Sequence, residues 1–296
     1  MLVTGAASGI GAQTARLLAA RGARLVLCDI DSIGLATLAN ELGSARALAR
    51  QADVRSLEQM QEAVAAGLER FGGIDFVIAN AGIASYGSVL AVDPDTFRRV
   101  IEVNLVGVFH TVRASLTTLI ERRGYILVVS SLAAFAPAPG MVAYGASKAG
   151  VEQLASALRL ELAHLGVGVG CAHMSWIDTP MVRDAQADLA SFGTSLASLP
   201  GPLGRVTPVQ HCAKAFVRAL ERRRRRVYVP AWVALLGWAK PLLSSRLAER
   251  EALARGAGLI ERMDEEIVRL GRSTSARTAA VQTSNTLGSG ETTGRE

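Results

Sequence analysis

The sequence predicts an α/β fold: a doubly wound parallel sheet flanked by helices on both faces, followed by a C-terminal helical extension. Apolar strand-like runs alternate with helix-like segments through the first 230 residues, the order that crossover connections between parallel strands require. The strand-like runs are apolar throughout, as expected for strands covered on both faces. A glycine-rich turn joins the first strand to the first helix, which is typical of this class.

The predicted elements follow one another with short connections. The predicted strands are 2–4, 23–29, a run within 45–54, 74–82, 125–131, 167–175 and 227–230. The predicted helices are 10–22, 32–43, 57–72, two helices within 94–122, and 144–166. Gly22 and Gly43 stand where helices end, a position that favours glycine. Almost no residue precedes the first strand, which leaves open a short strand or a start upstream of Met1.

The chain divides into a main domain and an extension. Residues 1–230 form the predicted α/β domain, whose loop at about 176–208 is expected to face the substrate. Residues 231–271 form the predicted helical extension, which is apolar at first and then amphipathic. Its last part has apolar side chains at spacings of three and four, namely Ile260, Met263, Ile267 and Leu270. Residues 272–296 are rich in Ser, Thr and Gly, and we expect a disordered tail there.

Cysteine and histidine usage limits the classes of function. The three cysteines lie far apart and the four histidines form no ligand pattern. We therefore expect no disulfide framework and no metal site, and a reducing, cytoplasmic location. Cys171 and His173 are two residues apart on a predicted strand, and a structural role is favoured for both.

Basic residues cluster at one place in the chain. Five arginines, 222–226, have no aromatic residues between them, so we expect no nucleic-acid partner. The run fits a solvated helix end or contact with an anionic surface such as membrane headgroups. The following apolar stretch with two tryptophans extends the candidate membrane-contact region to 222–247, or packs over a pocket or a neighbouring subunit. We find no signal peptide and no clean membrane span.

The glycine-rich turn "TGAASGIG" at 4–11 predicts a dinucleotide site. It follows a strand and opens a helix, where bare N–H groups and the positive end of the helix dipole favour a pyrophosphate. Glycine allows the close backbone approach that such a ligand needs. The residues expected to hold the cofactor here are Gly5, Ser8, Gly9, Ile10 and Gly11.

Asp29, at the end of the second strand, bears on the choice of cofactor. A carboxylate at this point accepts hydrogen bonds from an adenosine ribose and repels a 2′-phosphate. Ile30 follows in place of an arginine, and Ser8 stands where a basic residue would help NADP. NAD(H) is therefore predicted over NADP(H). Asp53 and Val54 follow the third strand and are expected at the adenine, although Asp53 also fits a helix N-cap.

Tyr144 and Lys148 form the candidate catalytic pair. They lie four residues apart on a predicted helix, so their side chains share one face. A nearby ammonium favours the phenolate and lowers the pKa of a phenol, which suits an acid–base group. Ser131 ends the preceding strand, at the edge of a parallel sheet where ligands bind, and is favoured over Ser130 for holding a substrate oxygen.

These motifs resemble the short-chain dehydrogenases/reductases in their compact, single-domain form with an NAD(P)-binding Rossmann fold. The resemblance covers roughly residues 1–230 and is carried in order by "TGAASGIG", "NAG" at 80–82, Asn104, "SS" at 130–131 and "YGASK" at 144–148. It implies a catalytic tetrad of Asn104, Ser131, Tyr144 and Lys148.

The resemblance also implies a role for each residue. Tyr144 would be the acid–base, Lys148 would bind the nicotinamide ribose, Ser131 would orient the substrate, and Asn104 would anchor a water in a proton relay. Asn80, Ala81 and Gly82 would pack along the cofactor, while Ile177 and Thr179 would hold its carboxamide.

One departure from the family pattern concerns the substrate. Met174-Ser175 replaces the usual Pro-Gly, which alters the pocket wall and puts a transferred substrate in doubt. Apolar segments at 132–141, 176–182 and 191–204 favour a lipophilic substrate such as a steroid, terpenoid or long-chain compound, or they simply pack a mobile lid.

The predicted function is NAD-dependent interconversion of a secondary alcohol and a ketone. The alternatives are a non-catalytic NAD-binding regulatory protein on the same fold, and a membrane-surface reductase of lipid substrates. The resemblance further implies a homotetramer or homodimer, with helices around 104–120 and 145–163 at the interface.

Overall fold

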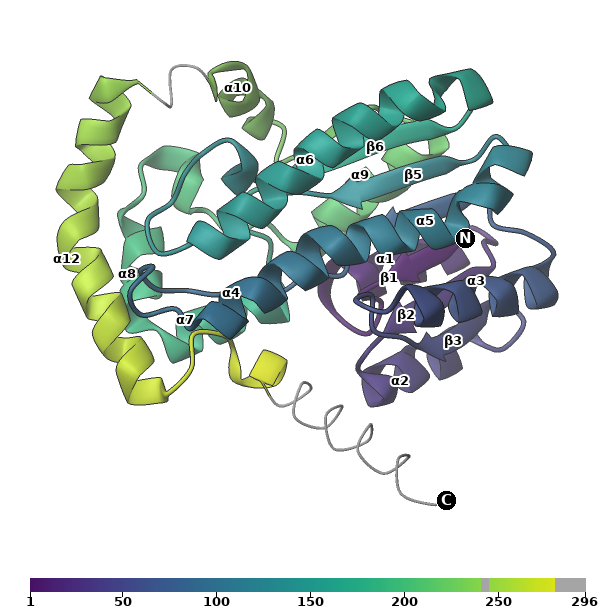
Figure 1. Ribbon diagram of the computed structural model, residues 1–296, viewed down its shortest axis with the longest axis horizontal. Helices are drawn as coiled ribbons and strands as arrows, with labels where there is room; N and C mark the ends of the chain where they lie inside the picture. Colours follow the sequence, from purple (N-terminus) through teal and green to yellow (C-terminus); the bar gives the residue numbers. More distant parts are fainter. Residues whose placement is uncertain (241–244, 280–296) are drawn as a thin grey trace.

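The computed structural model describes residues 1–240 and 245–279 (Figure 1). Within these residues seven parallel strands form one sheet, in the order β3-β2-β1-β4-β5-β6-β7. The strands are β1 (Leu2–Thr4), β2 (Leu25–Asp29), β3 (Ala47–Gln51), β4 (Phe76–Ala79), β5 (Tyr125–Val129), β6 (Gly168–Met174) and β7 (Arg226–Val229). The chain winds outward from β1 in one direction and from β4 in the other, which confirms the doubly wound sheet.

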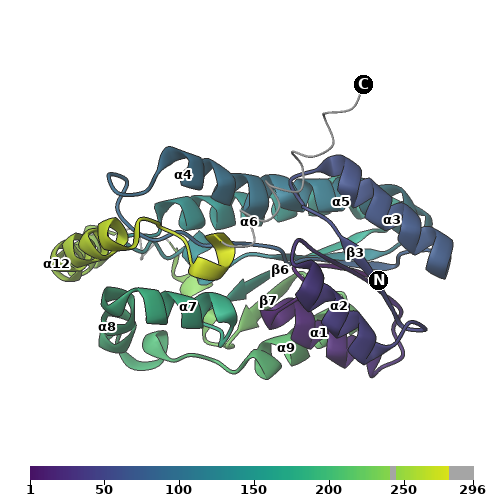
Figure 2. The same cartoon turned by 90° about the horizontal axis from the view of Figure 1, so that it is seen from below.

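Helices cover both faces of the sheet (Figure 2). One layer holds α1 (Gly9–Ala19), α2 (Ser32–Leu42) and α9 (Val209–Glu221). The other holds α3 (Leu57–Phe71), α4 (Pro94–Ile101), α5 (Gly107–Glu121) and α6 (Val142–Leu162). Beyond the carboxyl ends of the strands come α7 (Pro180–Asp188), α8 (Ala190–Ser198), α10 (Val233–Trp238) and α12 (Arg246–Leu270). Short 3₁₀ turns cover Leu132–Ala134, Ala163–Leu165 and Gly201–Gly204.

Local signals explain where several helices begin and end. The Asp31 carboxylate accepts a hydrogen bond from the Gly34 N–H and caps α2, and the Ser56 hydroxyl accepts one from the Gln59 N–H and caps α3. Gly72 ends α3 in the left-handed conformation, with φ of 74°. These caps orient each helix against the sheet and so fix the loops at its carboxyl edge.

The core lies in two apolar layers, one on each face of the sheet. Side chains of β1, β2 and β5 alternate between the layers: Val3 faces α1 and α9, whereas Leu2 faces α3 and α5. Every residue of β5 is buried. A sheet enclosed in this way holds the loops at its carboxyl edge rigidly, as a binding site requires.

A π-helical turn, Glu102–Val106, joins α4 to α5. The resulting helix, Pro94–Glu121, is the one among the described residues that is long and apolar enough to cross a membrane by length and composition. Here it packs on α3 and α6 in the helical layer. The prediction of two helices within 94–122 therefore corresponds to one helix with a wider turn.

Four parts of the structure differ from the sequence-based expectations. The 191–204 segment, expected to be mobile, contains α8, because Phe192 and Leu196 are buried against the domain. Helix α9 is absent from the predicted helices, although its end at Glu221 agrees with a helix end at the arginines 222–226, and α12 begins at Arg246, well before Ile260, where the amphipathic part of the predicted extension starts. Residues 272–279 belong to the predicted disordered tail, yet they pack on the domain because buried hydrogen bonds hold Arg272 and Ser273. The rest of that tail lies outside the described residues.

Candidate active site

The turn after β1 and the first turn of α1 form a glycine-lined cradle. Gly5 and Gly9 have φ of 63° and 54°, in the left-handed region that favours glycine. A Cβ on Gly11 would lie 2.0 Å from the Gly5 carbonyl oxygen, so only glycine lets α1 pack this closely. Ser8 precedes α1 without a side-chain hydrogen bond to its first turn, which leaves N–H groups of that turn for an anion.

Asn80, at the end of β4, fixes the shape of this cradle. Its Nδ2 donates to the carbonyl oxygens of Thr4 at 2.9 Å and of Gly5 at 3.1 Å. The Thr4 hydroxyl in turn accepts the backbone N–H groups of Asn80 and Ala81. The predicted "NAG" segment therefore joins the ends of β1 and β4, with Gly82 directly beyond them.

The Asp29 carboxylate lies at the carboxyl end of β2. It accepts hydrogen bonds from the backbone N–H groups of Ala7 at 2.9 Å and Asp31 at 3.0 Å. Burial raises the pKa of this carboxyl, while the backbone hydrogen bonds oppose that shift. These bonds hold the acceptor oxygens at the cavity wall, an arrangement that suits the hydroxyl groups of a ribose.

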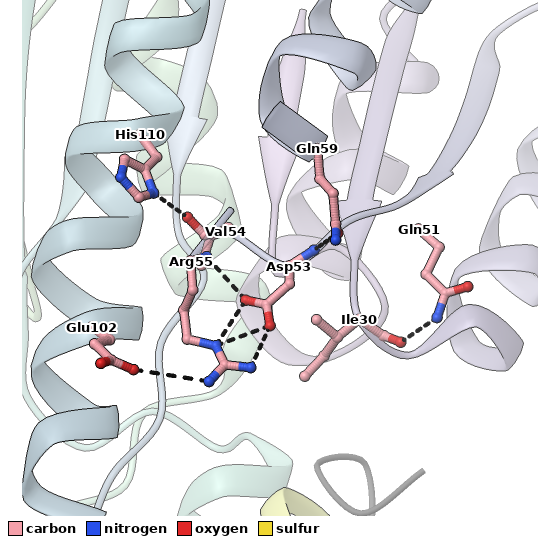
Figure 3. Close-up of polar contacts among 8 residues, drawn as sticks. All are labelled: Ile30, Gln51, Asp53, Val54, Arg55, Gln59, Glu102 and His110. Carbon is pink, nitrogen blue, oxygen red and sulfur yellow. Dashed lines mark hydrogen bonds and ion pairs between the residues drawn. The ribbon is translucent and has the colours of Figure 1, made fainter. Parts of the chain in front are cut away.

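Asp53 and Val54 line the same cavity as Asp29, and the Arg55 side chain turns back onto Asp53 (Figure 3). The Arg55 guanidinium donates to both carboxylate oxygens of Asp53, at 2.6 to 3.1 Å, and its NH1 lies 3.8 Å from Glu102. The alternative that Asp53 caps a helix is wrong, because Ser56 caps α3. Asp53 instead fixes Arg55 at one end of the cavity.

A cavity of about 260 Å³ joins these parts to the catalytic residues. Fourteen of the predicted site residues line it: Gly5, Ser8, Gly9, Ile10, Asp29, Ile30, Asp53, Val54, Asn80, Ala81, Gly82, Tyr144, Lys148 and Thr179. Four further predicted site residues do not line this cavity, namely Gly11, Asn104, Ser131 and Ile177. Most of the predicted cofactor residues therefore surround one space.

Tyr144 and Lys148 lie one turn apart on α6, as predicted. The Lys148 Nζ is 2.9 Å from the Val129 carbonyl oxygen, at the end of β5, and 5.6 Å from the centroid of the Tyr144 ring. The Ser131 hydroxyl accepts the Ala133 N–H and lies 3.4 Å from the Met174 carbonyl oxygen. Ser130 donates to the Lys148 carbonyl oxygen and so supports α6.

Burial dominates the titration of this pair. It raises the pKa of the Tyr144 phenol, and the hydrogen bond with Ser131 opposes that shift. It lowers the pKa of the Lys148 ammonium to about 8. Lys148 lies over the Tyr144 ring face and not at the hydroxyl, so its expected effect on the phenol stays a prediction.

Asn104 lies inside the π-helical turn and is fully buried. Its Oδ1 accepts the Ile83 N–H at 2.8 Å, and its Nδ2 donates to the Ile83 carbonyl oxygen and the Ser147 hydroxyl, both at 2.9 Å. The wider turn, typical of functional sites, brings this side chain toward α6. Asn104 thereby connects the helix to the strand-end segment beside Lys148, and its place in a proton relay stays a prediction.

The segment after β6 bounds the other side of the cavity. The Thr179 hydroxyl donates to the Ile177 carbonyl oxygen at 3.2 Å, and the Thr179 side chain lies over Gly9. Met174 lines the cavity where the family has proline, and the Ser175 hydroxyl is buried without a hydrogen-bond partner. Met174 is therefore part of this wall, and its effect on the choice of substrate stays a prediction.

An apolar cluster packs against Tyr144. It combines residues of the main domain with residues of α12, namely Ala84, Tyr86, Met141, Trp176, Val182, Phe192, Met263 and Ile267. Tyr86 and Trp176 each meet the Phe192 ring edge to face, with centroids 5.3 Å apart. The α12 part of the extension therefore packs on the main domain beside Tyr144. The apolar stretch after the arginines packs through Trp232, Val233 and Leu236 on Leu132, Ala134 and Phe135.

Cys171 and His173 share the face of β6 that packs on α6. The Cys171 Sγ is 3.7 Å from the His173 Nε2, which lies 3.7 Å from a Glu152 carboxylate oxygen. Burial raises the pKa of the Cys171 thiol to about 12, so this thiol stays protonated. No group of three His, Cys, Asp or Glu side chains able to hold a metal occurs among the described residues.

Among the cavity residues that the sequence did not identify are Arg277 and Thr278. They follow α12 and line the same space as Gly9 and Met181. Their segment carries only the signals of a polar tail, and nothing in its composition indicates that it folds back on the domain. Arg99 of α4 also lines the cavity and was likewise not predicted.

The strand order, the glycine cradle and the enclosed Tyr144–Lys148 pair define a dinucleotide-dependent oxidoreductase of the doubly wound α/β class. The cradle, where a Cβ on Gly11 would clash, and the acceptor oxygens of Asp29 fit a dinucleotide. The model of the short chain dehydrogenase family matches residues 1–190, and the chain belongs to that family.

Relatives and solved structures agree with this assignment. An uncharacterized NAD-dependent oxidoreductase of Mycobacterium tuberculosis is 33% identical over 232 residues, 73% of this chain and 82% of that protein. Trans-4-hydroxycyclohexanecarboxylate dehydrogenase of Sinomonas cyclohexanicum is 36% identical over 217 residues, 71% of this chain and 80% of that protein. The 3-ketoacyl-(acyl-carrier-protein) reductase from Brucella melitensis, complexed with NADH, has a TM-score of 0.69 at 30% identity, covering 77% of this chain and 95% of its own.

The chain is therefore an NAD(P)-dependent oxidoreductase that acts on CH–OH groups. The alternative of a non-catalytic regulatory protein is set aside.

Proposed function

We propose that this enzyme uses NAD(H) to interconvert a lipophilic, cyclic secondary alcohol and its ketone, with Tyr144 as the acid–base group. The position of Tyr144 carries the proposal. The residue lines the dinucleotide cavity together with Lys148 and also packs in the apolar cluster that includes Trp176 and Met263. A phenol at this boundary can exchange a proton with the oxygen of an apolar substrate that is bound beside the cofactor.

The preference for NAD(H) rests on Asp29. Its carboxylate is held at the cavity wall by two backbone N–H groups and disfavours a 2′-phosphate beside it. Ile30 lines the cavity next to it in place of a basic residue. The nearby Arg55 is engaged by Asp53 and Glu102, so it does not offset this charge.

The chain's residues would handle the proton and the positions of the reactants. When bound, the nicotinamide cofactor supplies the acceptor or donor of the hydride. Tyr144 takes the hydroxyl proton of the alcohol and returns it to the ketone in the reverse direction. Ser131 hydrogen-bonds the phenol and the substrate oxygen, and Lys148 contacts the nicotinamide ribose. Asn104 holds the backbone of Ile83 and the Ser147 hydroxyl in place beside them.

The substrate class is inferred from the apolar cluster. The members of this cluster are aliphatic or aromatic, and they include Met263 and Ile267 from α12. The relative from Sinomonas cyclohexanicum is named for a substituted cyclohexanol substrate, which supports a cyclic alcohol here. Steroids and terpenoids contain such rings and remain within the proposal.

The test is a screen of cyclic secondary alcohols with NAD⁺ and with NADP⁺, followed by the absorbance of the reduced nicotinamide. We expect turnover with NAD⁺, and Tyr144→Phe should reduce kcat by about 10²- to 10⁴-fold while NADH still binds. Tyr228→Phe, at a half-buried tyrosine of the edge strand β7 outside the cavity, serves as the control. Turnover that survives Tyr144→Phe would rule out this mechanism.

A cytoplasmic location with peripheral membrane contact is a second, separate part of the proposal. The three cysteines are free and buried, which suits a reducing compartment. On α10, Leu235 and Trp238 are 70% and 86% exposed, next in the chain to the arginine-flanked strand β7. Trp238→Ser should weaken co-sedimentation with anionic vesicles. Equal sedimentation of the wild type and the variant would contradict the proposed membrane contact.

Homo-oligomerisation through α5 and α6 belongs to the same proposal. Its support is the exposed apolar side chains on these helices, among them Phe109 and Leu160.

A further inference from the structure

The segment after α12, residues 271–279, folds back onto the domain as a strap. Arg272 binds the Asp188 carboxylate of α7 through two hydrogen bonds, of 2.8 and 2.9 Å. The Ser273 carbonyl oxygen accepts the Tyr86 N–H at 2.9 Å. Ser273 and Ser275 are 7% and 8% exposed, so the strap is buried along part of its length. These contacts fix the residues that follow.

The strap brings Arg277 to the dinucleotide cavity. Arg277 and Thr278 line the cavity together with Gly9 and Met181. The Arg277 Nε lies 3.3 Å from the Asp184 Oδ2, on α7. The start of α7 covers the phosphate cradle, since a Cβ on Gly9 would lie 3.4 Å from the Thr179 Cγ2. The guanidinium is therefore held beside the helix that adjoins the cradle.

The phosphate cradle has no cation of its own. The segment 4–11 contains no lysine or arginine. Arg55 is engaged by both oxygens of Asp53, and Lys148 donates to the Val129 carbonyl oxygen near the nicotinamide end. The contact between Arg277 and Asp184 is a single, partly exposed ion pair, with side-chain exposures of 56% and 26%, and such pairs are weak. Arg277 can therefore exchange Asp184 for a stronger anion.

We propose that Arg277 is a ligand of the cofactor pyrophosphate, supplied by the C-terminal strap and held ready by Asp184. The guanidinium would contact the phosphate oxygens from the side opposite the N–H groups of α1, where its fork of donors suits them. The strap thereby adds a cationic ligand to a binding site whose other lining residues come from the first 230 residues. This inference rests on the proposed binding of a nicotinamide dinucleotide and on no choice of substrate.

The experiment measures dissociation constants of the full chain for NADH, by fluorescence, and for ADP-ribose, by calorimetry. We expect Arg277→Gln to raise both constants about tenfold, because a charge-assisted hydrogen bond is lost, and to leave weak binding of adenosine unchanged. Arg277→Lys should recover part of the affinity. The wild-type affinity should fall more steeply with salt than that of Arg277→Gln.

Asp184→Asn provides a test of opposite sign. Removing the carboxylate frees the guanidinium, so NADH should bind several-fold more tightly in this variant. The effect should vanish in the double variant Asp184→Asn/Arg277→Gln, because the gain acts through Arg277. Arg269→Gln, at an exposed arginine of α12 outside the cavity, is the matched control and should leave all constants unchanged.

Three outcomes would overturn the inference: an unchanged ADP-ribose affinity in Arg277→Gln, an equal loss in Arg269→Gln, or a tightening by Asp184→Asn that persists without Arg277. The wild-type protein separates this failure from a failure of the proposed function. If the wild type binds no dinucleotide, the proposed cofactor is wrong. If the wild type binds NADH and Arg277→Gln binds it equally well, only the proposed role of the strap is wrong.

Discussion

Lys148 is one of three lysines among 32 basic residues, and its surroundings explain why lysine stands there. The side chain is 3% exposed, and its Nζ is bound to the Val129 carbonyl oxygen. A Cβ on Gly82 would lie 3.3 Å from that Nζ, so little space is left beside the ammonium. A compact head group fits this place, and a planar guanidinium is too large for it.

We therefore expect Lys148→Arg to lose most activity although it keeps the charge. We expect kcat to fall about 100-fold, because a guanidinium would not occupy the position of the ammonium beside the Tyr144 phenol and the nicotinamide ribose. Steady-state kinetics with the substrate found in the screen measures it, and Lys214→Arg on the surface of α9 is the matched control. Normal activity of Lys148→Arg would mean that charge alone suffices.

The affinity for NADH should depend on pH through Lys148. Burial lowers the pKa of its ammonium to about 8, below its usual value, so the free protein loses this proton as the pH rises through about 8. A ligand that prefers the ammonium must then take up a proton on binding. Affinity should be constant below that pH and fall above it.

Titrations with NADH between about pH 6.5 and 9.5 check this expectation. Lys148→Met should remove the decline in affinity over that range. A wild-type affinity that stays level to the upper limit would contradict the proposed contact.

At the residue scale, spacing predicted the Tyr144–Lys148 pair because a regular helix places residues four apart on one face. That rule does not predict the contacts of Asn104. The residue lies in a π-helical turn, which changes the direction of its side chain, and its partners Ile83 and Ser147 are distant in sequence. Its expected importance came from the resemblance alone. The role of Asp53 as a partner of Arg55 depends on side-chain geometry, which pattern does not contain.

Helix α12 is the element that sequence described least well. Its amphipathic part was predicted, but its contacts were not, because they join residues far apart in the chain. Asp264 accepts the Ser88 N–H, and Glu266 accepts the Ser191 hydroxyl. Met263 and Ile267 insert beside Gly140 and Gly87, where added Cβ atoms would lie 2.7 and 2.4 Å from them. Two glycines thus provide the space in which the helix is seated.

Gly140→Ala should loosen this helix. Gly140 has φ of 77°, so alanine adds backbone strain, and its Cβ would also press on the Met263 Sδ. Overpacking of this kind costs roughly 1–3 kcal/mol. We expect faster hydrogen exchange across 259–270 and a wider range of accepted alcohols.

Gly43→Ala is the control for Gly140→Ala. Gly43 has φ of 83° but meets no atom within 4 Å, so it isolates the strain from the contact. Equal exchange of α12 in both variants would contradict the seating role of Gly140.

The whole molecule carries an exposed apolar surface on α5 and α6. Phe109 is 51% exposed and Leu160 75% exposed, on the two helices expected to form the subunit interface. Phe109→Glu should shift the protein to a smaller species in light scattering after size exclusion. Ile33→Glu, at an 80% exposed residue of α2, should leave the mass unchanged. If the wild-type protein is a monomer, the predicted interface is wrong.

At the scale of the whole molecule, the sheet and its two helical layers were predictable because apolar runs and helical periodicity are local signals. The return of residues 271–279 to the cavity was not, because it depends on pairs such as Arg272 with Asp188. The dinucleotide side of the site was therefore predictable from the first 230 residues. The residues that the extension contributes to the site could be identified only from the three-dimensional structure.

The position of the strap in the chain has a consequence for biosynthesis. Residues 259–279 are translated after the whole sheet, so a nascent chain can form the cradle and the Tyr144–Lys148 pair before it has the wall that Met263, Ile267 and Arg277 provide. The sheet can therefore fold before the residues that complete the site have been synthesised. A chain truncated near residue 240 would retain the sheet and its helices, but the cluster beside Tyr144 would lack Met263 and Ile267 and would stay exposed to solvent and to chaperones.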